Sequence, residues 1–293
     1  MIDLDQLGLN DESASNQLVP GMVDTSDIAR RIESLPPMPI VVQEILTLAE
    51  SANADAAAYE ELFSKDQLLT AQLLKMVNSP FFRRSKEIAT IPDAVVALGL
   101  NSVKTLVLAN FASGGLKVDA ALYQHTPEGL FEHAIATAAT AKLLCLTSKP
   151  MSNALADELF VAGLMHDVGK VVLAPLAIAI APVDGADVLA NEEAIFSTNH
   201  IEVASRVLSA WRITGDINLW ITNHHRANAS EPGPMACLQL ADQLTNSWGI
   251  GRTEDYRTLP PSRRLIKALE ISDADLIEIE AQARTQLSEA NLS

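Results

Sequence analysis

Apolar residues recur at helical spacing along most of the chain. In the first half the apolar stripes fall at residues 28–32, 41–48, 59–63, 68–77, 92–98 and 103–111. Spacings of three and four residues place such side chains on one face of a helix. No segment shows the convincing alternation of apolar and polar residues that a half-buried strand requires. The pattern therefore predicts an all-α protein.

Proline and capping residues mark the ends of these helices. Residues 35–39 contain three prolines, which remove backbone donors and stop the first helix. Asp66 precedes an apolar run and is typical of an N-cap. Residues 126–128, Thr-Pro-Glu, predict the start of the first helix of the second half. Asn199 and Glu202 have the spacing of a capping box.

The weakly patterned stretch from Gly114 to Gln124 predicts a boundary between two helical lobes. We assign the chain to four parts: a mobile N-terminal tail at 1–24, an N-terminal lobe at 25–118, a second lobe at 119–250 and a peripheral C-terminal helical segment at 251–293. The last part is acidic and carries few large apolar residues. We therefore expect its removal from about Asp255 onward to leave the fold intact.

Residues 160–170 carry the densest chemistry of the chain. His166 and Asp167 end an apolar helical run and are followed by Gly169 and Lys170. We expect Gly169 to take the left-handed conformation that ends the helix, so that Lys170 folds back over the pair. An imidazole beside a carboxylate can bind a divalent metal, and an ammonium beside them suits a phosphate.

Further metal-ligating residues are concentrated in the second half. They are His133, His200, His224, His225 and Asp242. Each alone is most often an ordinary core or surface residue, but inward-facing histidines and carboxylates from separate helices are how bundle cores hold two metals. Adjacent helical residues diverge by about 100°, so His224 and His225 could both bind only near a helix end or across two metals. His125 lies in a polar stretch, and we expect no role for it.

Composition limits the possible partners and surroundings. The formal charge is −16, from 21 basic and 37 acidic residues, which argues against binding a nucleic-acid duplex. The longest apolar run, residues 171–183, contains two prolines and is too short to span a bilayer. Cys145 and Cys237 fall in apolar helical patterns, as small core residues of a reducing compartment do. We expect a cytoplasmic protein that does not bind a membrane.

The order of these residues carries a resemblance to a known superfamily. His133, the pair His166-Asp167 and then Asp242 look like the H…HD…D signature of the HD superfamily of metal-dependent phosphohydrolases. With the remaining histidines the chain is similar to the HD-GYP phosphodiesterases. This resemblance implies that one or two divalent ions are held by His133, His166, Asp167, His200, His224, His225 and Asp242. It further implies that Lys170 helps to hold the phosphate.

One departure limits that resemblance. HD-GYP proteins follow the His-His pair with Glu and then a Gly-Tyr-Pro loop that contacts the cyclic dinucleotide. Here His225 is followed by Arg226-Ala227-Asn228, and Gly233-Pro234 comes later with no tyrosine between. Hydrolysis of cyclic-di-GMP is therefore not expected.

Motifs in the first half resemble a second, more specific family. They are Leu-Pro-Pro-Met-Pro at 35–39, Lys-Asp-Gln-Leu-Leu-Thr at 65–70, Val-Asn-Ser at 77–79 and Ile-Pro-Asp-Ala-Val-Val-Ala-Leu-Gly-Leu at 91–100. Together they resemble the HDOD domain, over about residues 28–228. HDOD proteins are bacterial signalling and regulatory modules, and many have lost the metal ligands. The resemblance implies other signalling proteins as partners.

Two functions remain open from the sequence. The first is a regulatory HDOD module that retains an HD-type metal centre. The second is a metal-dependent phosphohydrolase or phosphodiesterase acting on a phosphate ester or nucleotide, with Asp167 bridging the metals and Lys170 neutralising the phosphate. Mixed imidazole and carboxylate ligands suit Fe, Mn, Ni or Zn, and ligand type does not choose among them.

Overall fold

A computed structural model describes residues 23–49, 51, 54–83, 85–114, 117–177, 187–226 and 232–290. Throughout these residues the regular secondary structure is helical, and the one exception is an isolated bridge between His125 and Arg252. The prediction of an all-α protein is confirmed. Residues 1–22, which make up most of the expected tail, lie outside the described part of the chain.

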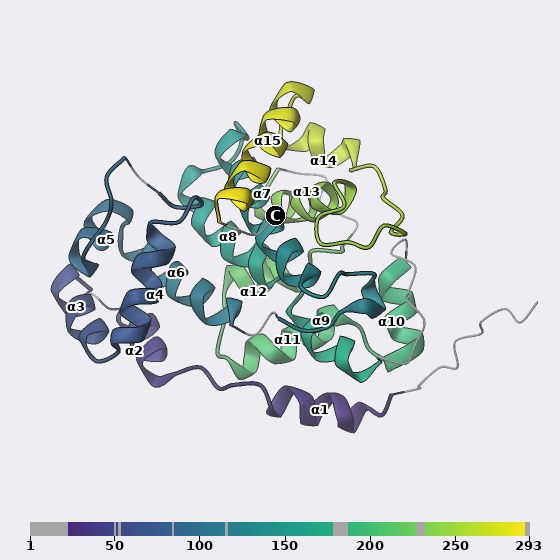
Figure 1. Cartoon of the computed structure of the whole chain (residues 1–293), viewed down its shortest axis with the longest axis horizontal. Helices are drawn as coiled ribbons and strands as arrows, with labels where there is room; N and C mark the ends of the chain where they lie inside the picture. Colours follow the sequence, from purple (N-terminus) through teal and green to yellow (C-terminus); the bar gives the residue numbers. More distant parts are fainter. Residues whose placement is uncertain are drawn as a thin grey trace, which may run out of the picture.

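The first half folds into six helices: α1 (Thr25–Glu33), α2 (Ile40–Ala49), α3 (Ala56–Ser64), α4 (Gln67–Val77), α5 (Ile91–Leu98) and α6 (Leu100–Ser113). Asp66 caps α4 as predicted, because its carboxylate accepts a hydrogen bond from Leu69 N at 2.9 Å. Helices α2 to α5 lie together on the left of Figure 1, and α1 runs below the second half, where it contacts α9.

The described part of the second half contains seven helices: α7 (Gly129–Thr147), α8 (Ala156–Met165), α9 (Val168–Leu173), α10 (Val188–Phe196), α11 (His200–Ala210), α12 (Asp216–Ile221) and α13 (Pro234–Ser247). It also contains three short 3-10 turns, at Ala121–Tyr123, Asn153–Leu155 and Ala174–Leu176. Helix α7 begins at Gly129, two residues later than predicted, with Glu128 and not Thr126 at the N-cap position. The backbone N–H of Thr126 donates to Gly251 O at 3.1 Å. Asn199 caps α11 as predicted.

Small residues let α7 and α8 pack closely at the centre of the molecule. A Cβ added at Gly163 would lie 2.7 Å from Ala138 Cα, so α8 can touch the backbone of α7 only with glycine there. The stretches Gly129–Thr147 and Asn153–Leu176 are long and apolar enough to cross a membrane, but 83% and 89% of their apolar windows are buried inside the fold. The apolar side chains of these two stretches belong to the hydrophobic core.

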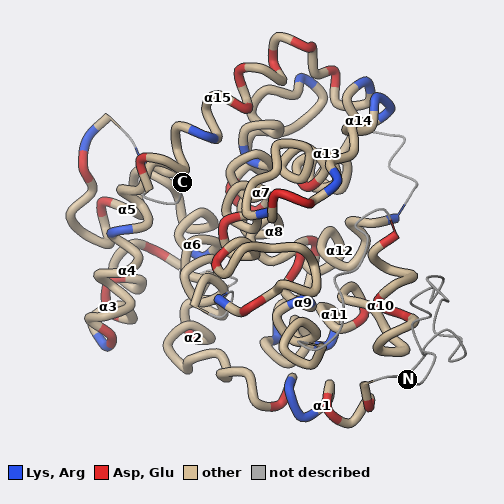
Figure 2. The backbone as a smooth tube through the Cα atoms, turned by 45° about the vertical axis from the view of Figure 1, so that its right-hand side comes forward, with Lys and Arg blue, Asp and Glu red and all other residues tan. Residues whose placement is uncertain are grey.

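The C-terminal segment packs more intimately than its sequence pattern predicts. Helix α15 (Asp273–Glu289) lies against α7 and buries Ile279, Ala283 and Leu287, while α14 (Arg263–Ala268) buries Leu265 and Ile266. Buried residues of both halves and of this segment form one continuous hydrophobic core. Figure 2 shows acidic residues in both halves of the described chain. Three acidic side chains, Asp167, Glu192 and Asp242, are buried.

Candidate metal centre

All seven residues proposed as metal ligands come together in the second half. His133 comes from α7, His166 and Asp167 from the turn between α8 and α9, His200 from the first position of α11, His224 and His225 from the turns after α12, and Asp242 from α13. Six of the seven are buried and His225 is partly buried. Five helices or their ends therefore aim polar side chains at one place in an otherwise apolar core.

Asp167 lies between two groups of these side chains. Its Oδ2 is 3.3 Å from His166 Nε2 and 3.8 Å from His133 Nε2. Its Oδ1 is 3.6 Å from His200 Nε2 and 3.9 Å from His224 Nε2. Each carboxylate oxygen thus faces a different set of histidines, which is the arrangement that a bridging ligand between two metals requires.

Two sets of ligand atoms are compact enough to hold one ion each. His133, His166 and Asp167 form one set, and His200, His224 and His225 form the other; within each set the ligand atoms lie within 4.8 Å of one another. Asp242 adjoins the first set, with its Oδ1 3.1 Å from His133 Nε2 and 3.6 Å from His166 Nε2.

The outer nitrogen of three imidazoles is fixed by an acceptor. His166 Nδ1 lies 2.7 Å from Gly163 O, and His224 Nδ1 lies 2.7 Å from Ile221 O. His200 Nδ1 lies 2.7 Å from Glu192 Oε2, and Glu192 Oε2 also accepts the backbone N–H of His200. Protons on these Nδ1 atoms leave the Nε2 lone pairs pointing inward, as in metal-bound histidines.

The inward atoms have no hydrogen-bond partner in the described part of the chain. They are His166 Nε2, Asp167 Oδ1, His200 Nε2, His224 Nε2 and His225 Nε2, all buried. Polar atoms left unpaired in a core cost stability, and several together demand a common partner. Imidazole nitrogens and a carboxylate oxygen in this arrangement fit divalent transition-metal ions.

The protonation of these groups also suits a cation. Burial lowers the pKa of His133 and of His225 to about 4 and that of His224 well below its usual value, so these imidazoles are neutral at pH 7. Burial opposes the charge of Asp167, but His166 and Lys170 hold its pKa well below the usual range. His166 is the exception: burial lowers its pKa, but the carboxylates of Asp167 and Asp242 raise it to about 10. Its imidazole is therefore charged at pH 7 and releases a proton when a metal binds.

Gly169 has a different role from the one predicted. It lies inside α9 and does not adopt a positive φ, so it does not end the helix by a left-handed turn. A Cβ at this position would instead meet the backbone of His200, 2.8 Å from its Cα. Glycine is needed here because α9 packs directly on the first turn of α11.

Lys170 lies where the sequence predicts, over the His-Asp pair. Its Nζ is 2.7 Å from Asp167 Oδ2 and 5.3 Å from the centre of the Tyr123 ring. Three residues near the proposed ligands were not predicted from the sequence: Glu192, Tyr123 and Arg252. No spacing relates them to the histidines, so the sequence offers no signal for them. His125, for which we expect no role, is a buried histidine whose Nδ1 bonds with Gly251 O at 2.9 Å.

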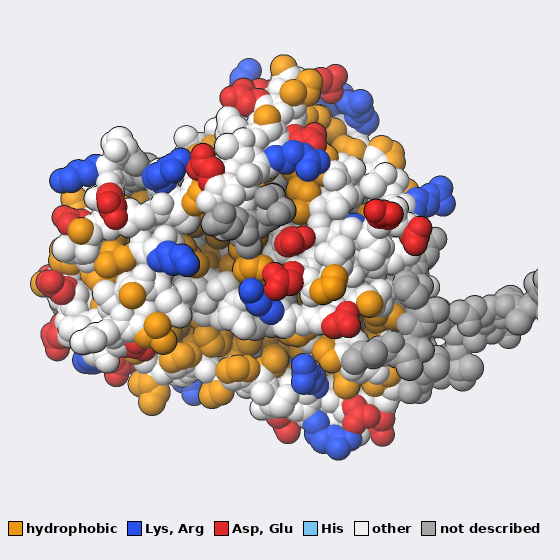
Figure 3. Space-filling model, in the orientation of Figure 1, with side chains coloured by type: hydrophobic (Ala, Val, Ile, Leu, Met, Phe, Trp, Pro, Cys, Tyr) orange, Lys and Arg blue, Asp and Glu red, His pale blue; other side chains and the backbone are white. Residues whose placement is uncertain are grey.

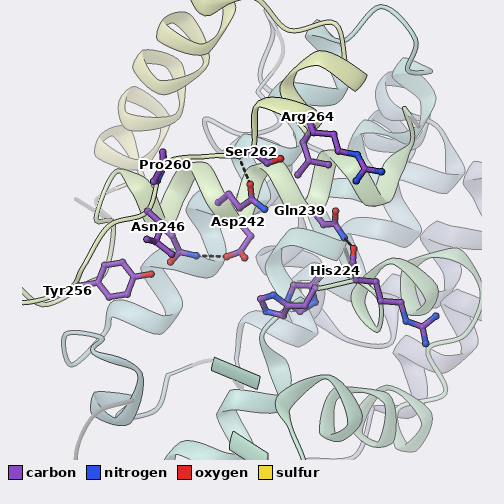
Figure 4. A pocket seen from close by; sticks show the side chains of 13 residues that line it. His224, Gln239, Asp242, Asn246, Tyr256, Pro260, Ser262 and Arg264 are labelled. Atoms are coloured by element: carbon purple, nitrogen blue, oxygen red, sulfur yellow. Dashed lines mark hydrogen bonds between the residues drawn. The ribbon is translucent and has the colours of Figure 1, made fainter. Parts of the chain in front are cut away.

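A cavity of about 370 Å³ opens beside the centre. Its lining comprises His224, His225, Arg226, Gln239, Asp242, Gln243, Asn246, Tyr256, Leu259, Pro260, Ser262, Arg264 and Leu265. In Figure 4, Asn246 points toward Asp242 on the same helix, His224 lies below them, and Tyr256 lies at the left end. A small molecule in this cavity would touch the proposed ligands His224, His225 and Asp242.

Comparison with known sequences identifies the family. The profile of the HDOD domain matches residues 35–227. The chain belongs to the HDOD domain family. His133 to His225 lie within the matched region, whereas Asp242, Arg252 and Tyr256 lie beyond it. An uncharacterized protein of Treponema pallidum is 28% identical over 170 residues, and the aligned part covers 55% of this chain and 32% of that protein. The chain thus spans about a third of the length of that curated relative.

Solved structures share the fold. An HDOD domain protein of unknown function from Geobacter sulfurreducens superposes with a TM-score of 0.65 at 23% identity, covering 92% of this chain and 98% of that one. A candidate phosphohydrolase from Shewanella amazonensis gives 0.62 at 22% identity, covering 92% and 98%. A candidate signal transduction protein from Marinobacter aquaeolei gives 0.62 at 18%, covering 94% and 67%.

Proposed function

We propose that this HDOD protein is a metal-dependent phosphohydrolase that acts on a phosphate ester. The observation that carries the proposal is the set of buried, unpartnered ligand atoms around Asp167. HDOD proteins that act only through protein contacts have no need of such a set. Names given to related folds, a phosphohydrolase and a signal transduction protein, are compatible with it.

The residues proposed to hold two divalent ions are His133, His166, Asp167, His200, His224, His225 and Asp242. When bound, such ions polarise a phosphate oxygen and lower the pKa of the attacking water. Fe, Mn, Ni and Zn all suit these ligands.

The protein residues supply position and charge. Asp167 presents one oxygen to each histidine group and so fixes their separation. Lys170, paired with Asp167, adds a positive charge where a phosphate would sit. Glu192 orients His200 from outside the centre. The apolar core around α7 and α8 excludes bulk water, which strengthens each of these interactions.

Elemental analysis of protein purified without chelator tests the proposal. We expect near-stoichiometric Fe, Mn, Ni or Zn in the wild type, and none in the double variant His166→Ala/Asp167→Ala. The exposed change Asp255→Ala serves as the matched control and should leave the metal content unchanged. Wild-type protein that is metal-free and cannot be loaded would contradict the proposal.

A substrate screen follows once metal is found. Phosphomonoesters, phosphodiesters and nucleotides are incubated with the metal-loaded wild type and double variant. Turnover that the double variant lacks is the expected result. Metal binding without turnover would leave the ions a structural or sensing role and remove the enzymatic proposal.

A regulatory role through protein contacts is the second candidate. The N-terminal helices expose large apolar side chains, with exposed fractions of 76% for Ile40, 68% for Leu68 and 83% for Val96. Figure 3 shows apolar side chains gathered on the face where α2 and α3 lie. Large apolar side chains are also exposed outside these helices, at Leu146, Leu219, Leu259 and Ile277. Exposed apolar surface on the N-terminal lobe favours a protein partner there, here another cytoplasmic signalling protein. Copurification that Ile40→Ser/Val96→Ser abolishes would support this role.

A further inference from the structure

A second, smaller cavity of about 50 Å³ lies against the proposed metal ligands. Its lining is Tyr123, Lys170, Val188, His225, Asp242, Asn246, Arg252 and Tyr256. Four of these residues, His225, Asp242, Asn246 and Tyr256, also line the larger cavity. The two spaces are therefore neighbours that meet beside the centre. Two cationic side chains, Lys170 and Arg252, face the small one.

Arg252 is held rigidly but has no acidic partner among the described residues. Its Nε and Nη2 donate to Asn246 Oδ1, and its Nη1 donates to Tyr123 O. Its guanidinium carbon lies 4.4 Å from the centre of the Tyr256 ring. An arginine has five N–H groups, so these three hydrogen bonds leave two donors free. The carboxylates of Asp167 and Asp242 act on this guanidinium only from beyond salt-bridge distance. A largely enclosed cation so placed favours an anion that binds it directly.

We propose that the small cavity binds the phosphoryl group of a phosphate monoester, with Arg252 and Lys170 as its cationic contacts. The larger cavity then takes the alcohol part of the ester. This inference rests on the proposed phosphohydrolase function and names its substrate class. Arg252 acts as a binding residue for the phosphate, and the aromatic ring of Tyr256 and the Asn246 amide hold its guanidinium in place.

Charge and space both favour a monoester over a diester. A monoester phosphate carries close to two negative charges at neutral pH. Arg252 offers it a positive charge without a salt-bridge partner among the described residues, beside Lys170, which Asp167 also contacts, and the proposed metals. A space of about 50 Å³ suits a phosphoryl group alone, and one larger cavity adjoins it. A diester needs room for a substituent on each side of the phosphorus.

Half of the residues that line this subsite come from the C-terminal part of the chain. Asp242, Asn246, Arg252 and Tyr256 all follow residue 227, where the HDOD match ends. Thus the family fold would provide most of the metal centre and the Lys170 contact, and the segment after it would add the Arg252 contact.

Binding of inorganic phosphate to metal-loaded protein tests the subsite directly. We expect Arg252→Gln to weaken phosphate binding by roughly 10- to 100-fold, the usual loss for a hydrogen bond to a charged group. Arg252→Lys keeps the charge and should lose less. Arg257→Gln, an exposed arginine of the same segment outside both cavities, is the control and should bind as wild type does. Melting temperature and metal content are measured in parallel for every variant.

The outcomes separate this inference from the proposed function. Weaker phosphate binding at unchanged metal content and melting temperature supports the subsite. Equal phosphate affinity in Arg252→Gln and wild type overturns it, as does a loss that only mirrors a loss of metal. Metal-loaded wild type that binds no phosphate overturns the subsite while leaving the metal centre in place. Metal-free wild type contradicts the proposed function itself.

A kinetic comparison tests the substrate class. Metal-loaded wild type is assayed with p-nitrophenyl phosphate and with bis(p-nitrophenyl) phosphate. A higher kcat/KM for the monoester, with Arg252→Gln raising its KM at least about tenfold, is the expected result. Preference for the diester, or equal effects of Arg252→Gln on both substrates, overturns the assignment to monoesters.

Discussion

Gly169 lies directly against the backbone of His200. No side chain fits between them, since an added Cβ would come within 2.8 Å of His200 Cα and closer still to its carbonyl oxygen. The contact joins the turn that carries His166 and Asp167 to the helix start that carries His200. Helix packing at this point therefore sets the relative position of the two proposed ligand groups.

Gly169→Ala should loosen this contact and misplace His200. Overpacking of a tight core contact typically costs about 1–3 kcal/mol in the free energy of unfolding. We expect a lower melting temperature and a lower metal content after purification. Gly233→Ala is a suitable control, because a Cβ at Gly233 meets nothing within 4 Å and its φ of 173° is extended backbone. A fully metal-loaded Gly169→Ala protein would contradict the prediction.

Glu192→Gln should weaken metal binding without unfolding the protein. The carboxylate accepts hydrogen bonds from both the backbone and Nδ1 of His200, and the amide keeps the shape but removes the charge. Loss of such an outer partner typically lowers metal affinity about 10- to 100-fold. Competition against a chelator of known affinity measures the change. The exposed neighbour Glu193→Gln should retain wild-type affinity.

Removal of the residues after Thr253 should destabilise the fold, which reverses the expectation from sequence. The segment buries Leu265, Ile266, Ile279 and Leu287, and each fully buried aliphatic side chain contributes about 1.5–3 kcal/mol. We expect the shortened chain to be insoluble or to melt far below the full chain. Thermal unfolding followed by circular dichroism decides this, and a melting temperature equal to that of the full chain would show that α14 and α15 are dispensable.

Cyclic-di-GMP should not be hydrolysed at a useful rate. The residues after His225 lack the Gly-Tyr-Pro sequence that contacts this dinucleotide, although residues 227–231 themselves lie outside the described structure. Chromatography of cyclic-di-GMP after incubation with metal-loaded protein measures the rate. Conversion by wild type that an Asp167→Ala variant lacks would prove the prediction wrong.

The elements of the fold could be predicted because they depend on local signals. Asp66 and Asn199 cap their helices as expected, and their capping geometry involves residues only three positions away. The start of α7 lies two residues later than the sequence predicts, where Thr126 contacts Gly251, far along the chain, and no local pattern encodes that contact. The family could also be recognised, since its motifs are contiguous stretches of sequence.

The candidate site was predictable in its residue types but not in its surroundings. Histidine and aspartate side chains are common metal ligands, so the proposed ligands could be named from the sequence. Glu192 and Arg252 have no such signature, since both are among the commonest surface residues. Their role follows only from burial beside His200 and Tyr123, which is a tertiary property. The role of Gly169 likewise depends on a backbone contact that no local pattern encodes.

The contact between His133 and Asp242 spans 109 residues of sequence. During synthesis, His133, His166, Asp167, His200, His224 and His225 all leave the ribosome before Asp242 does. Until α13 packs against α7, Asp242 is missing from the proposed centre, and the histidines are accessible to competing ions and to water. Metal chosen at that stage would be selected by an incomplete site. If the proposed centre takes up metal before it closes, protein refolded in the presence of one metal should differ in metal content from protein loaded after folding.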